Sequence, residues 1–285
     1  MAPAPAIRAG RRVGEAAPGP AAIPARDGRG HGRRATRQEG SAIVVIAPRP
    51  ELPPAAAPPG RPLVTLSYAQ TLDGRLATLD GSSRWIGGPA SLRFAHELRA
   101  AHDAIVVGVG TVLRDDPRLT VRLAPGRDPL RVVVDSALRT PPTAAVLADG
   151  AAAGTVLAVT ARAPAGRRDA ATALGATVLE LPAGADGRVD LAALLAALRG
   201  RGVGAVMVEG GAALITALLA ARLVDRLAVC VAPKILGAGL AAVGDLGIRD
   251  LDRALALRDV RAAVCGADLL LTARVDYPEG PDGGA

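Results

Sequence analysis

Cysteine and histidine are scarce in this sequence of 285 residues, which contains two cysteines and three histidines. Cys230 and Cys265 both lie in apolar stretches and no CxxC pair occurs, which predicts buried free thiols rather than disulfide bonds or a redox motif. A zinc site built from protein ligands requires about four suitable side chains at a characteristic spacing. We therefore expect no metal site.

Aromatic residues and long hydrophobic runs are also rare. The chain contains one Trp, two Tyr and one Phe, and arginine replaces lysine everywhere except at Lys234, a compositional bias that by itself indicates no chemistry. No run approaches the roughly 20 apolar residues of a membrane-spanning helix. The run at residues 42–47 is too short and too far from the start for a signal peptide. We therefore expect a cytoplasmic protein without a membrane partner.

Acidic charge is low relative to basic charge, which leaves a net charge of +7. Residues 1–61 hold ten arginines against four acidic residues, so residues 62–285 are nearly neutral. A basic tail can bind nucleic acid, but this one has no aromatic residues for base stacking. Its Ala, Pro, Gly and Arg composition predicts a disordered extension, with a possible short strand at 43–47 and a proline-rich linker at 48–62. Residues 279–285 are predicted to form a disordered tail.

Residues 62–278 read as one α/β domain, and the hydrophobic half of the sequence is enough for a substantial core. Short β-branched runs predict strands at 63–69, 104–107, 130–134, 155–159, 177–181, 205–208 and 226–231. Ala- and Leu-rich stretches predict helices at 88–101, 165–174, 191–201 and 212–221. Two final apolar runs, 254–263 and 267–275, predict an antiparallel hairpin. The expected fold is a mostly parallel sheet with an antiparallel C-terminal hairpin and helices on both faces.

The end of the first predicted strand carries polar residues. The strand runs through Ala69 into the turn signal Asp73-Gly74, and the loop that follows contains Ser83 and Trp85. One interpretation is a hairpin with the tryptophan as a core plug. In the other, the small alanine lets a flat ring approach, while the serine and the tryptophan supply a hydroxyl and an aromatic wall.

A second strand end carries the segment Gly108–Pro117, which we interpret as a loop. Its Gly-x-Gly permits close backbone approach to a phosphate or a ring, although the third glycine of a dinucleotide fingerprint is missing. Asp115 and Asp116 are adjacent, and two carboxylates in a partly buried loop require hydrogen-bond donors. A helix cap could account for one of them, whereas a polar ligand with amide or amine groups could account for the pair.

Two further strand ends have candidate ligands. The run Val132–Ser136 ends in a turn, where Ser136 has a minor possible role toward a cofactor phosphate. The strand at 205–208 leads into Glu209, then Gly210-Gly211, then an Ala-rich helix whose free N–H groups could bind a diphosphate. Glu209 could cap this helix or bind ring N–H groups of a ligand.

One predicted helix carries His96, Arg93 and Arg99, and His102 follows it. Neither histidine has a nearby Ser or Cys arrangement for nucleophilic catalysis, so we expect both to be structural or exposed to solvent. The arginines could form a solvated face, or an arginine directed at a strand end could bind a phosphate.

Four segments occur in a specific order: TLSYAQTLDGRLAT, VGVGTVLRDDPRLTVR, VVVDS, and VMVEGG followed by LVDRLAVCVAPKILGAG. Over residues 62–275 this series resembles the reductase domain of riboflavin biosynthesis. That domain is the C-terminal half of the bacterial bifunctional deaminase-reductase and a stand-alone enzyme in archaea and fungi. The resemblance implies a dihydrofolate-reductase-like fold, a homodimer, and NADPH-dependent reduction of the ribosyl group of a phosphoribosylamino-pyrimidine to a ribityl chain.

The resemblance also implies roles for individual residues. It places NADPH against Ala69, Trp85, Thr111, Asp115 and the helix start formed by Gly211, Ala212, Ala213, Leu214, Ile215, Thr216 and Ala217. It places the substrate against Ser83, Arg99, Leu119, Arg122 and Glu209, with the arginines suited to the 5′-phosphate. The predicted catalytic residues are Asp115, which would assist opening of the ribose ring or stabilise the developing cation, and Glu209, which would orient the pyrimidine.

Two departures from the family pattern and two alternatives complete the prediction. Ser67 stands where bifunctional enzymes typically carry a lysine, and the deaminase half is absent and not replaced by residues 1–61. One alternative keeps the fold but changes the substrate to a dihydrofolate-like molecule or a secondary-metabolite pyrimidine or pteridine. The other is a non-enzymatic protein associated with nucleic acid through its arginine-rich tail.

Overall fold

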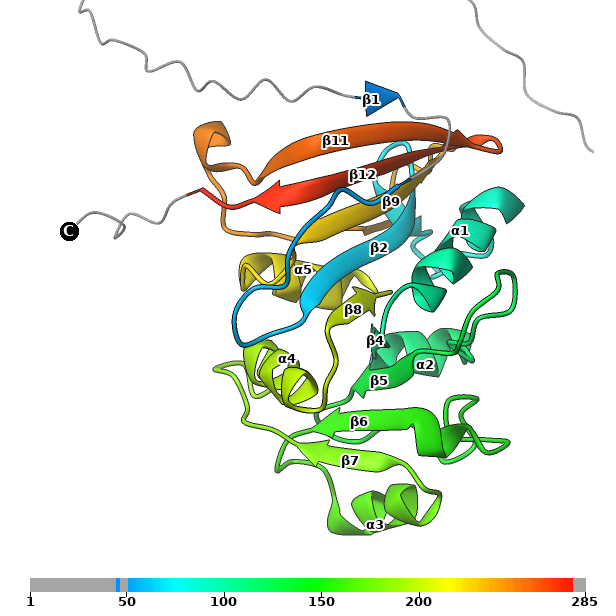
Figure 1. Ribbon diagram of the computed structural model, residues 1–285, viewed down its shortest axis with the longest axis vertical. Helices are drawn as coiled ribbons and strands as arrows, with labels where there is room; N and C mark the ends of the chain where they lie inside the picture. The colour runs from blue at the N-terminus through cyan, green and yellow to red at the C-terminus, as the bar shows by residue number, and fades with distance from the viewer. Residues whose placement is uncertain (1–44, 47–50, 279–285) are drawn as a thin grey trace, which may run out of the picture. The chain divides into compact units, whose positions relative to one another are not determined.

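The chain folds around a large twisted sheet (Figure 1). The computed structural model describes residues 45–46 and 51–278, all within one compact unit, Ser41–Ala285. Within these residues ten strands lie side by side in the order β1-β11-β12-β9-β2-β8-β4-β5-β6-β7. Their bounds are β1 (Val45–Ile46), β2 (Leu63–Thr71), β4 (Ala104–Gly108), β5 (Leu130–Val134), β6 (Thr155–Val159), β7 (Thr177–Glu180), β8 (Ala205–Val208), β9 (Arg226–Ala232), β11 (Ala256–Cys265) and β12 (Asp268–Asp276). A small second sheet pairs β3 (Arg75–Ala77) with β10 (Leu240–Ala241).

The direction of the strands confirms the predicted topology. From β9 through β2, β8, β4, β5 and β6 to β7, every pair is parallel, whereas β12 is antiparallel to both β9 and β11. The predicted C-terminal hairpin is therefore the β11–β12 pair. Because parallel strands end at the same edge, the carboxyl ends of β2, β4 and β8 meet there, where ligands bind in open α/β sheets.

Helices cover both faces of the sheet, as predicted. They are α1 (Pro89–Ala100), α2 (Val109–Asp115), α3 (Ala165–Ala173), α4 (Leu191–Gly200) and α5 (Ala212–Ala220). Successive side chains of a strand point to opposite faces. Val106 accordingly packs in one core cluster with the leucines of α4 and α5, while Val107 packs in another with Val112 of α2 and Ala171 of α3.

Helix α2 corrects the prediction of a glycine-rich loop at 108–117. Val109 and Val112, one turn apart, are buried against the sheet, and this contact supports a helix of only seven residues. Asp116 ends the helix in the left-handed conformation, with φ 41°, and its Oδ1 accepts the N–H of Ala145 at 2.7 Å. Asp116 is exposed and has a structural role, so the adjacent carboxylates do not form a buried pair.

Residues 51–61, which belong to the predicted extension and linker, contact the sheet without forming a helix or a strand. The hydroxyl of Thr272 in β12 donates to the carbonyl oxygen of Glu51 at 2.6 Å, and Arg61 forms a bidentate ion pair with Asp225. Within the predicted short strand at 43–47, β1 pairs with β11. The other residues of the predicted extension, and the tail at 279–285, lie outside the described residues.

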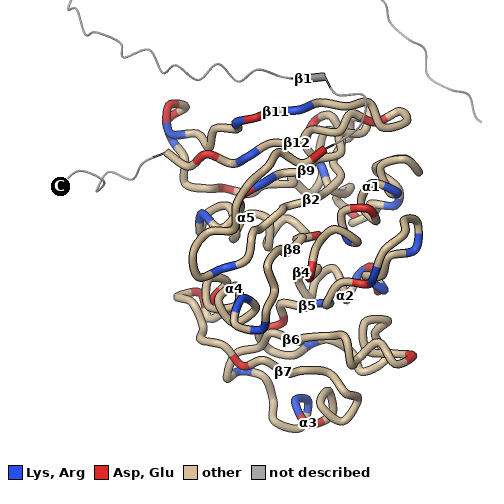
Figure 2. Tube along the Cα trace, viewed as in Figure 1, with Lys and Arg blue, Asp and Glu red and all other residues tan. Residues whose placement is uncertain are grey.

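Charge and hydropathy add two observations. Figure 2 shows basic and acidic positions interspersed along the described part of the chain. None of the helices in that part has the length and hydropathy to cross a membrane.

Candidate active site

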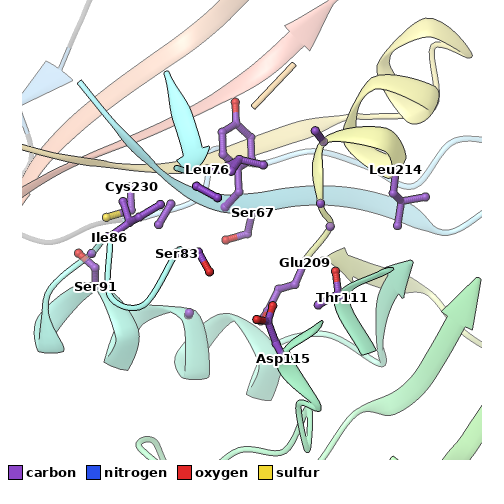
Figure 3. A pocket seen from close by; sticks show the side chains of 18 of the residues that line it. Ser67, Leu76, Ser83, Ile86, Ser91, Thr111, Asp115, Glu209, Leu214 and Cys230 are labelled. Atoms are coloured by element: carbon purple, nitrogen blue, oxygen red, sulfur yellow. The ribbon is translucent and has the colours of Figure 1, made fainter. Parts of the chain in front are cut away.

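A cavity of about 550 Å³ opens at the carboxyl ends of β2, β4 and β8. Its walls come from the ends of these strands, the start of α5, helices α1 and α2, and residues 83–87, which we call the rim segment. Figure 3 shows the side chains of Ser83, Thr111, Asp115 and Glu209 directed into this space from different segments. Three of the predicted strand ends therefore share one site: those followed by Ser83 and Trp85, by Thr111 and Asp115, and by Glu209.

Helix α2 presents one face to the cavity. Thr111, Arg114 and Asp115 all line it, because residues three and four positions apart lie on the same side of a helix. Gly108 and Gly110 line it as well, at the start of α2. The helix therefore supplies a hydroxyl, a cation and a carboxylate.

The turn from β8 into α5 forms another part of the cavity wall. The N–H of Glu209 donates to Val106 of β4 at 3.0 Å, so the sheet's hydrogen bonding fixes the glutamate backbone. A Cβ on Gly210 would meet Leu214 at 3.3 Å, and one on Gly211 would lie 3.8 Å from Thr111 Oγ1. No side chain caps the start of α5. Its first N–H groups and positive dipole end are therefore suited to an anion.

Glu209 forms a bidentate ion pair with Arg99 of α1. Arg99 Nε and Nη2 donate to the two carboxylate oxygens, each at 2.6 Å, and Nη1 donates to the carbonyl oxygen of Thr120 at 3.0 Å. The side chains are 9% and 21% exposed for Arg99 and Glu209, so solvent screens the pair only partly. The ion pair fixes the orientation of the Glu209 carboxylate and occupies two of the three guanidinium nitrogens of Arg99.

His96 lies behind the ion pair and is almost fully buried. Its Nδ1 accepts the backbone N–H of Arg122 at 2.9 Å, and because an N–H can only donate, this nitrogen is unprotonated. Burial, and then the positive charges of Arg99 and Arg122, hold the pKa of His96 below its usual value. The neutral ring links α1 to the segment after Leu119, in agreement with the predicted structural role.

A buried carboxylate supports the floor of the cavity, which Ser91 and Cys230 help to line. Asp268 of β12 accepts hydrogen bonds at Oδ2 from the N–H of Gly88 and the hydroxyl of Ser91, both at 2.6 Å, and from Cys230 Sγ at 3.5 Å. Burial is the main cause that raises the pKa of Cys230 to about 11. Cys230 is therefore a thiol at neutral pH and a poor nucleophile. Both cysteines are free, as predicted, and Cys265 is partly buried.

Trp85 corrects one of the two interpretations of the first motif. Its side chain is 66% exposed at the cavity wall, so the core-plug interpretation is wrong. The preceding strand β2 extends two residues beyond Ala69, and the turn at Asp73-Gly74 leads into β3. The tryptophan is thus available to contact a ligand.

Most of the predicted site residues line the cavity: Ala69, Ser83, Trp85, Arg99, Thr111, Asp115, Glu209, Gly211, Ala212, Ala213 and Leu214. Their individual roles stay predictions. Six others are not part of the wall: Leu119, Arg122, Ser136, Ile215, Thr216 and Ala217.

Several of these six have structural contacts instead. Leu119 and Ile215 are buried in the two core clusters, so their side chains are not available to a ligand. The hydroxyl of Ser136 accepts the N–H of Val189 at 3.0 Å. That of Thr216 donates to the carbonyl oxygen of Ala212 and accepts the N–H of Gly244, at 2.7 and 2.8 Å. Arg122 is exposed beside His96.

The structure also adds cavity residues that the sequence prediction missed, including Tyr68, Ser91, Arg114 and Cys230. For Arg114 a signal existed. If residues 109–115 are interpreted as a helix, the spacing of Thr111 and Asp115 places Arg114 on the same face. For the floor residues there was none, because contacts among α1, β9 and β12 arise only in the folded chain.

No group of three or more His, Cys, Asp or Glu side chains within the described ranges could hold a metal ion. The site therefore offers two kinds of chemistry: an anion-binding helix start, and a set of charged and hydroxyl groups around an otherwise apolar cavity. Such a combination is typical of a site for a dinucleotide and a small polar substrate.

Comparison with known proteins agrees with this geometry. A 2,5-diamino-6-ribosylamino-4(3H)-pyrimidinone 5′-phosphate reductase of Methanothermobacter thermautotrophicus is 45% identical over 216 residues, which are 74% of this chain and 97% of that protein. The riboflavin biosynthesis protein RibD of Aquifex aeolicus is 40% identical over 212 residues, 74% of this chain and 57% of that protein. The chain thus spans little more than half of RibD.

Solved structures include RibD of Acinetobacter baumannii (form 2), which is 29% identical and matches with a TM-score of 0.66 over 76% of this chain and 59% of that one. The family model described as the RibD C-terminal domain matches residues 62–271, which contain every wall of the cavity. The chain therefore belongs to the RibD C-terminal domain family.

Proposed function

We propose that the protein is a cytoplasmic reductase that uses NADPH to convert the ribosyl group of a 5-amino-6-(5-phosphoribosylamino)pyrimidine into a ribitylamino group in riboflavin biosynthesis. The observation that carries the proposal is that one cavity combines the uncapped start of α5 with the Arg99–Glu209 ion pair. The first suits a diphosphate and the second a polar ring. The name of the archaeal relative favours the 2,5-diamino form of the pyrimidine as the substrate.

The residues present fit a nicotinamide dinucleotide. A diphosphate at the start of α5 would approach the backbone of Gly210 and Gly211, and a Cβ on Gly210 would crowd Leu214 at 3.3 Å. Thr111 supplies a hydroxyl, and the exposed Trp85 supplies a flat apolar surface for a ring. NADPH rather than NADH is part of the proposal, for which the family resemblance is the support.

Arg114 is our added candidate for a phosphate contact. The resemblance suggested Arg99 for the substrate 5′-phosphate. Its Nε and Nη2 donate to Glu209, however, and its Nη1 donates to the carbonyl oxygen of Thr120. Arg114 lines the cavity with an exposed side chain. A phosphate at the cavity mouth would gain a charge-assisted contact there without breaking the ion pair.

The chemistry requires proton handling more than a nucleophile. The substrate's ribose ring must open to an imine before C1′ can accept a hydride, which a bound nicotinamide supplies. In this proposal Asp115, which ends α2 and lines the cavity, handles the proton that O4′ gains as the C1′–O4′ bond breaks. Glu209 holds the pyrimidine by accepting its N–H groups, and Arg99 keeps that carboxylate oriented.

The test is an assay of NADPH oxidation with three substrates: the 2,5-diaminopyrimidinone phosphate, the aminouracil phosphate and dihydrofolate. We expect turnover with a phosphoribosylamino-pyrimidine, and mass spectrometry of the product should show a ribityl chain two hydrogens heavier. Replacing NADPH with NADH tests the cofactor preference. Activity on dihydrofolate alone would overturn the riboflavin assignment.

We also propose that the protein is a homodimer. The support is an apolar cross-strand pair on β11 and β12, Val264 opposite Leu269, which are 72% and 41% exposed. The family resemblance also implies a homodimer, and contact with a second copy would cover these side chains. Sedimentation equilibrium of the purified chain should give twice the mass of the 28.6 kDa monomer, and a monomer at micromolar concentration would contradict the proposal.

A further inference from the structure

The rim segment, residues 83–87, forms part of the cavity wall without belonging to a helix or a strand. Ser83, Trp85, Ile86 and Gly87 all line the cavity. Within the segment, the N–H of Ile86 donates to the carbonyl oxygen of Ser83 at 3.0 Å. One such turn is a weak constraint, so the position of the rim must depend on contacts with other parts of the fold.

Side chains tether the rim to three different elements. Lys234 Nζ donates to the carbonyl oxygens of Trp85 and Ile86, at 2.7 and 3.0 Å. Arg84 Nη2 donates to the carbonyl oxygen of Asp115 at 2.8 Å, and Asp268 accepts the N–H of Gly88, the residue that follows the segment. The lysine is the tether that binds the centre of the rim, at two successive residues.

The backbone around Lys234 is held by hydrogen bonds to the turn after β2. The carbonyl oxygen of Lys234 accepts the N–H of Leu72 at 2.8 Å, and the carboxylate of Asp73 accepts the N–H groups of Leu236 and Gly237. The hydroxyl of Thr71, and then these two N–H groups, hold the pKa of Asp73 down at about 2. Asp73 is thus a carboxylate at any working pH, and the turn after β2 fixes the base of the lysine.

The chemistry of the lysine side chain fits the contacts that it makes. The sequence has 34 basic residues, and Lys234 is the single lysine among them. A compact ammonium group with three rotatable donors can meet two successive carbonyl oxygens, whereas the planar guanidinium fork is matched to a carboxylate or a phosphate. Lysine therefore stands at the position where the contacts favour an ammonium group.

We propose that Lys234 is a positioning residue for cofactor binding: it holds the rim segment so that Ser83 and Trp85 form the cavity wall. The inference rests on the proposed function only for the identity of the ligand. The lysine is not part of the cavity wall, so it acts through the rim and not by contact with the reacting atoms.

The experiment compares Lys234→Met, which removes the donors, with Lys234→Arg, which keeps a cation. Arg253→Met, at an exposed residue after β10, is the matched control for the loss of one positive charge. Trp85 is the single tryptophan, so the anisotropy of its fluorescence reports the rim alone. Amide hydrogen exchange of residues 81–88, NADPH titration and steady-state kinetics complete the measurements.

For Lys234→Met we expect faster exchange at residues 81–88, lower Trp85 anisotropy, and about a tenfold rise in the NADPH dissociation constant, with kcat changed much less than KM for NADPH. Lys234→Arg should recover part of this loss, and Arg253→Met should match the wild type. The midpoint of thermal unfolding should stay close to that of the wild type, because no core contact is removed.

Unchanged exchange and anisotropy in Lys234→Met would overturn the inference, as would an arginine variant that binds NADPH no better than the methionine variant. Failure of the proposed function has a different signature. In that case wild-type protein would not bind NADPH at all, while exchange and anisotropy would still test whether Lys234 holds the rim.

Discussion

The two sides of the cavity are held in place by different kinds of interaction. On the strand side, Glu209 continues the hydrogen bonding of the sheet, and buried valines fix α2 against the same strands. On the rim side, the backbone of residues 83–87 depends on tethers from Lys234, Arg84 and Asp268. One side is built into the core, and the other is attached to it by a few side chains.

This difference separates two functions of the site. Main-chain hydrogen bonds and core packing resist single substitutions, so the strand side can keep charged groups at fixed positions for chemistry. A tethered rim can change its position when one side chain is lost, without unfolding the domain. We therefore expect substitutions on the strand side to affect turnover or stability, and substitutions in the rim tethers to affect cofactor binding.

The largest expected effect is on the strand side, at Asp115. Asp115→Asn should lower kcat by roughly 10²–10⁴-fold, the usual range for loss of a positioned acid or base, and this loss should exceed any change in the NADPH dissociation constant. Asp116→Asn is the matched control, because Asp116 is exposed and bonds Ala145 instead of lining the cavity. Stopped-flow measurement of a single turnover gives the rate.

Two outcomes would contradict this assignment. Near-wild-type turnover in Asp115→Asn would remove Asp115 from the mechanism. An equal loss in Asp116→Asn would show that the end of α2 matters for its shape and not for a specific carboxylate. Lower Trp85 anisotropy in Asp115→Asn would show that the two sides of the cavity are not independent.

The next effect concerns stability and tests whether the strand side is rigid because of its ion pair. Arg99→Met leaves the partly buried carboxylate of Glu209 unpaired and should cost about 2–4 kcal/mol in the free energy of unfolding. Glu209→Gln should cost less, because an amide can still accept from Arg99. A double-mutant cycle by urea unfolding should give a coupling energy of about 1–3 kcal/mol.

Additive losses in that cycle would mean that the pair contributes little to stability, despite its bidentate geometry. In that case the strand side would be held by the sheet alone. The rim should not respond in any of these variants, so exchange at residues 81–88 is the internal control.

The sequence predicted the parts of the fold that depend on local pattern. β5, β6 and β8 begin and end at the predicted residues, because short β-branched runs between polar segments define them. Helix α2 was missed because it is short, begins with Gly108-Val109-Gly110 and is stabilised by the sheet it covers. The pattern there contains too few residues to show a helical period.

The site was predictable only as separate strand ends. The motifs indicated that Arg99 and Glu209 both face a ligand, but not that they bind each other across 110 residues of sequence. The contact of Lys234 with the backbone of Trp85 spans 149 residues and involves carbonyl oxygens, which every residue has. No residue type marks such an acceptor, so this tether becomes visible only in the folded chain.

The smallest expected effect is a dependence of stability on pH that arises on the strand side. His102 is buried between α1 and β2. The carbonyl oxygen of Leu98 can only accept, so Nδ1 carries the proton, and Nε2 accepts from the hydroxyl of Thr65 at 2.9 Å. Burial is the main cause that lowers the pKa of His102. His96 has a lowered pKa for the same main reason, so both rings are neutral in the folded protein at neutral pH.

Because the folded-state pKa lies below the unfolded value of about 6.5, the unfolded chain takes up protons that the folded chain does not, as the pH falls below that value. The free energy of unfolding should be nearly constant above about pH 7.5, where the unfolded histidines are also neutral, as far as these two groups determine it. Below that pH it should decrease by at most about 1.4 kcal/mol per pH unit for each histidine, until the folded-state pKa is reached.

Urea unfolding between pH 7.5 and 5 measures the slope, and histidine proton NMR gives each folded-state pKa directly. If the comparison of the two sides holds, Trp85 anisotropy in the folded protein stays unchanged over this range, because neither His96 nor His102 tethers the rim. A drop in anisotropy without loss of stability would place a pH-sensitive group in the rim instead.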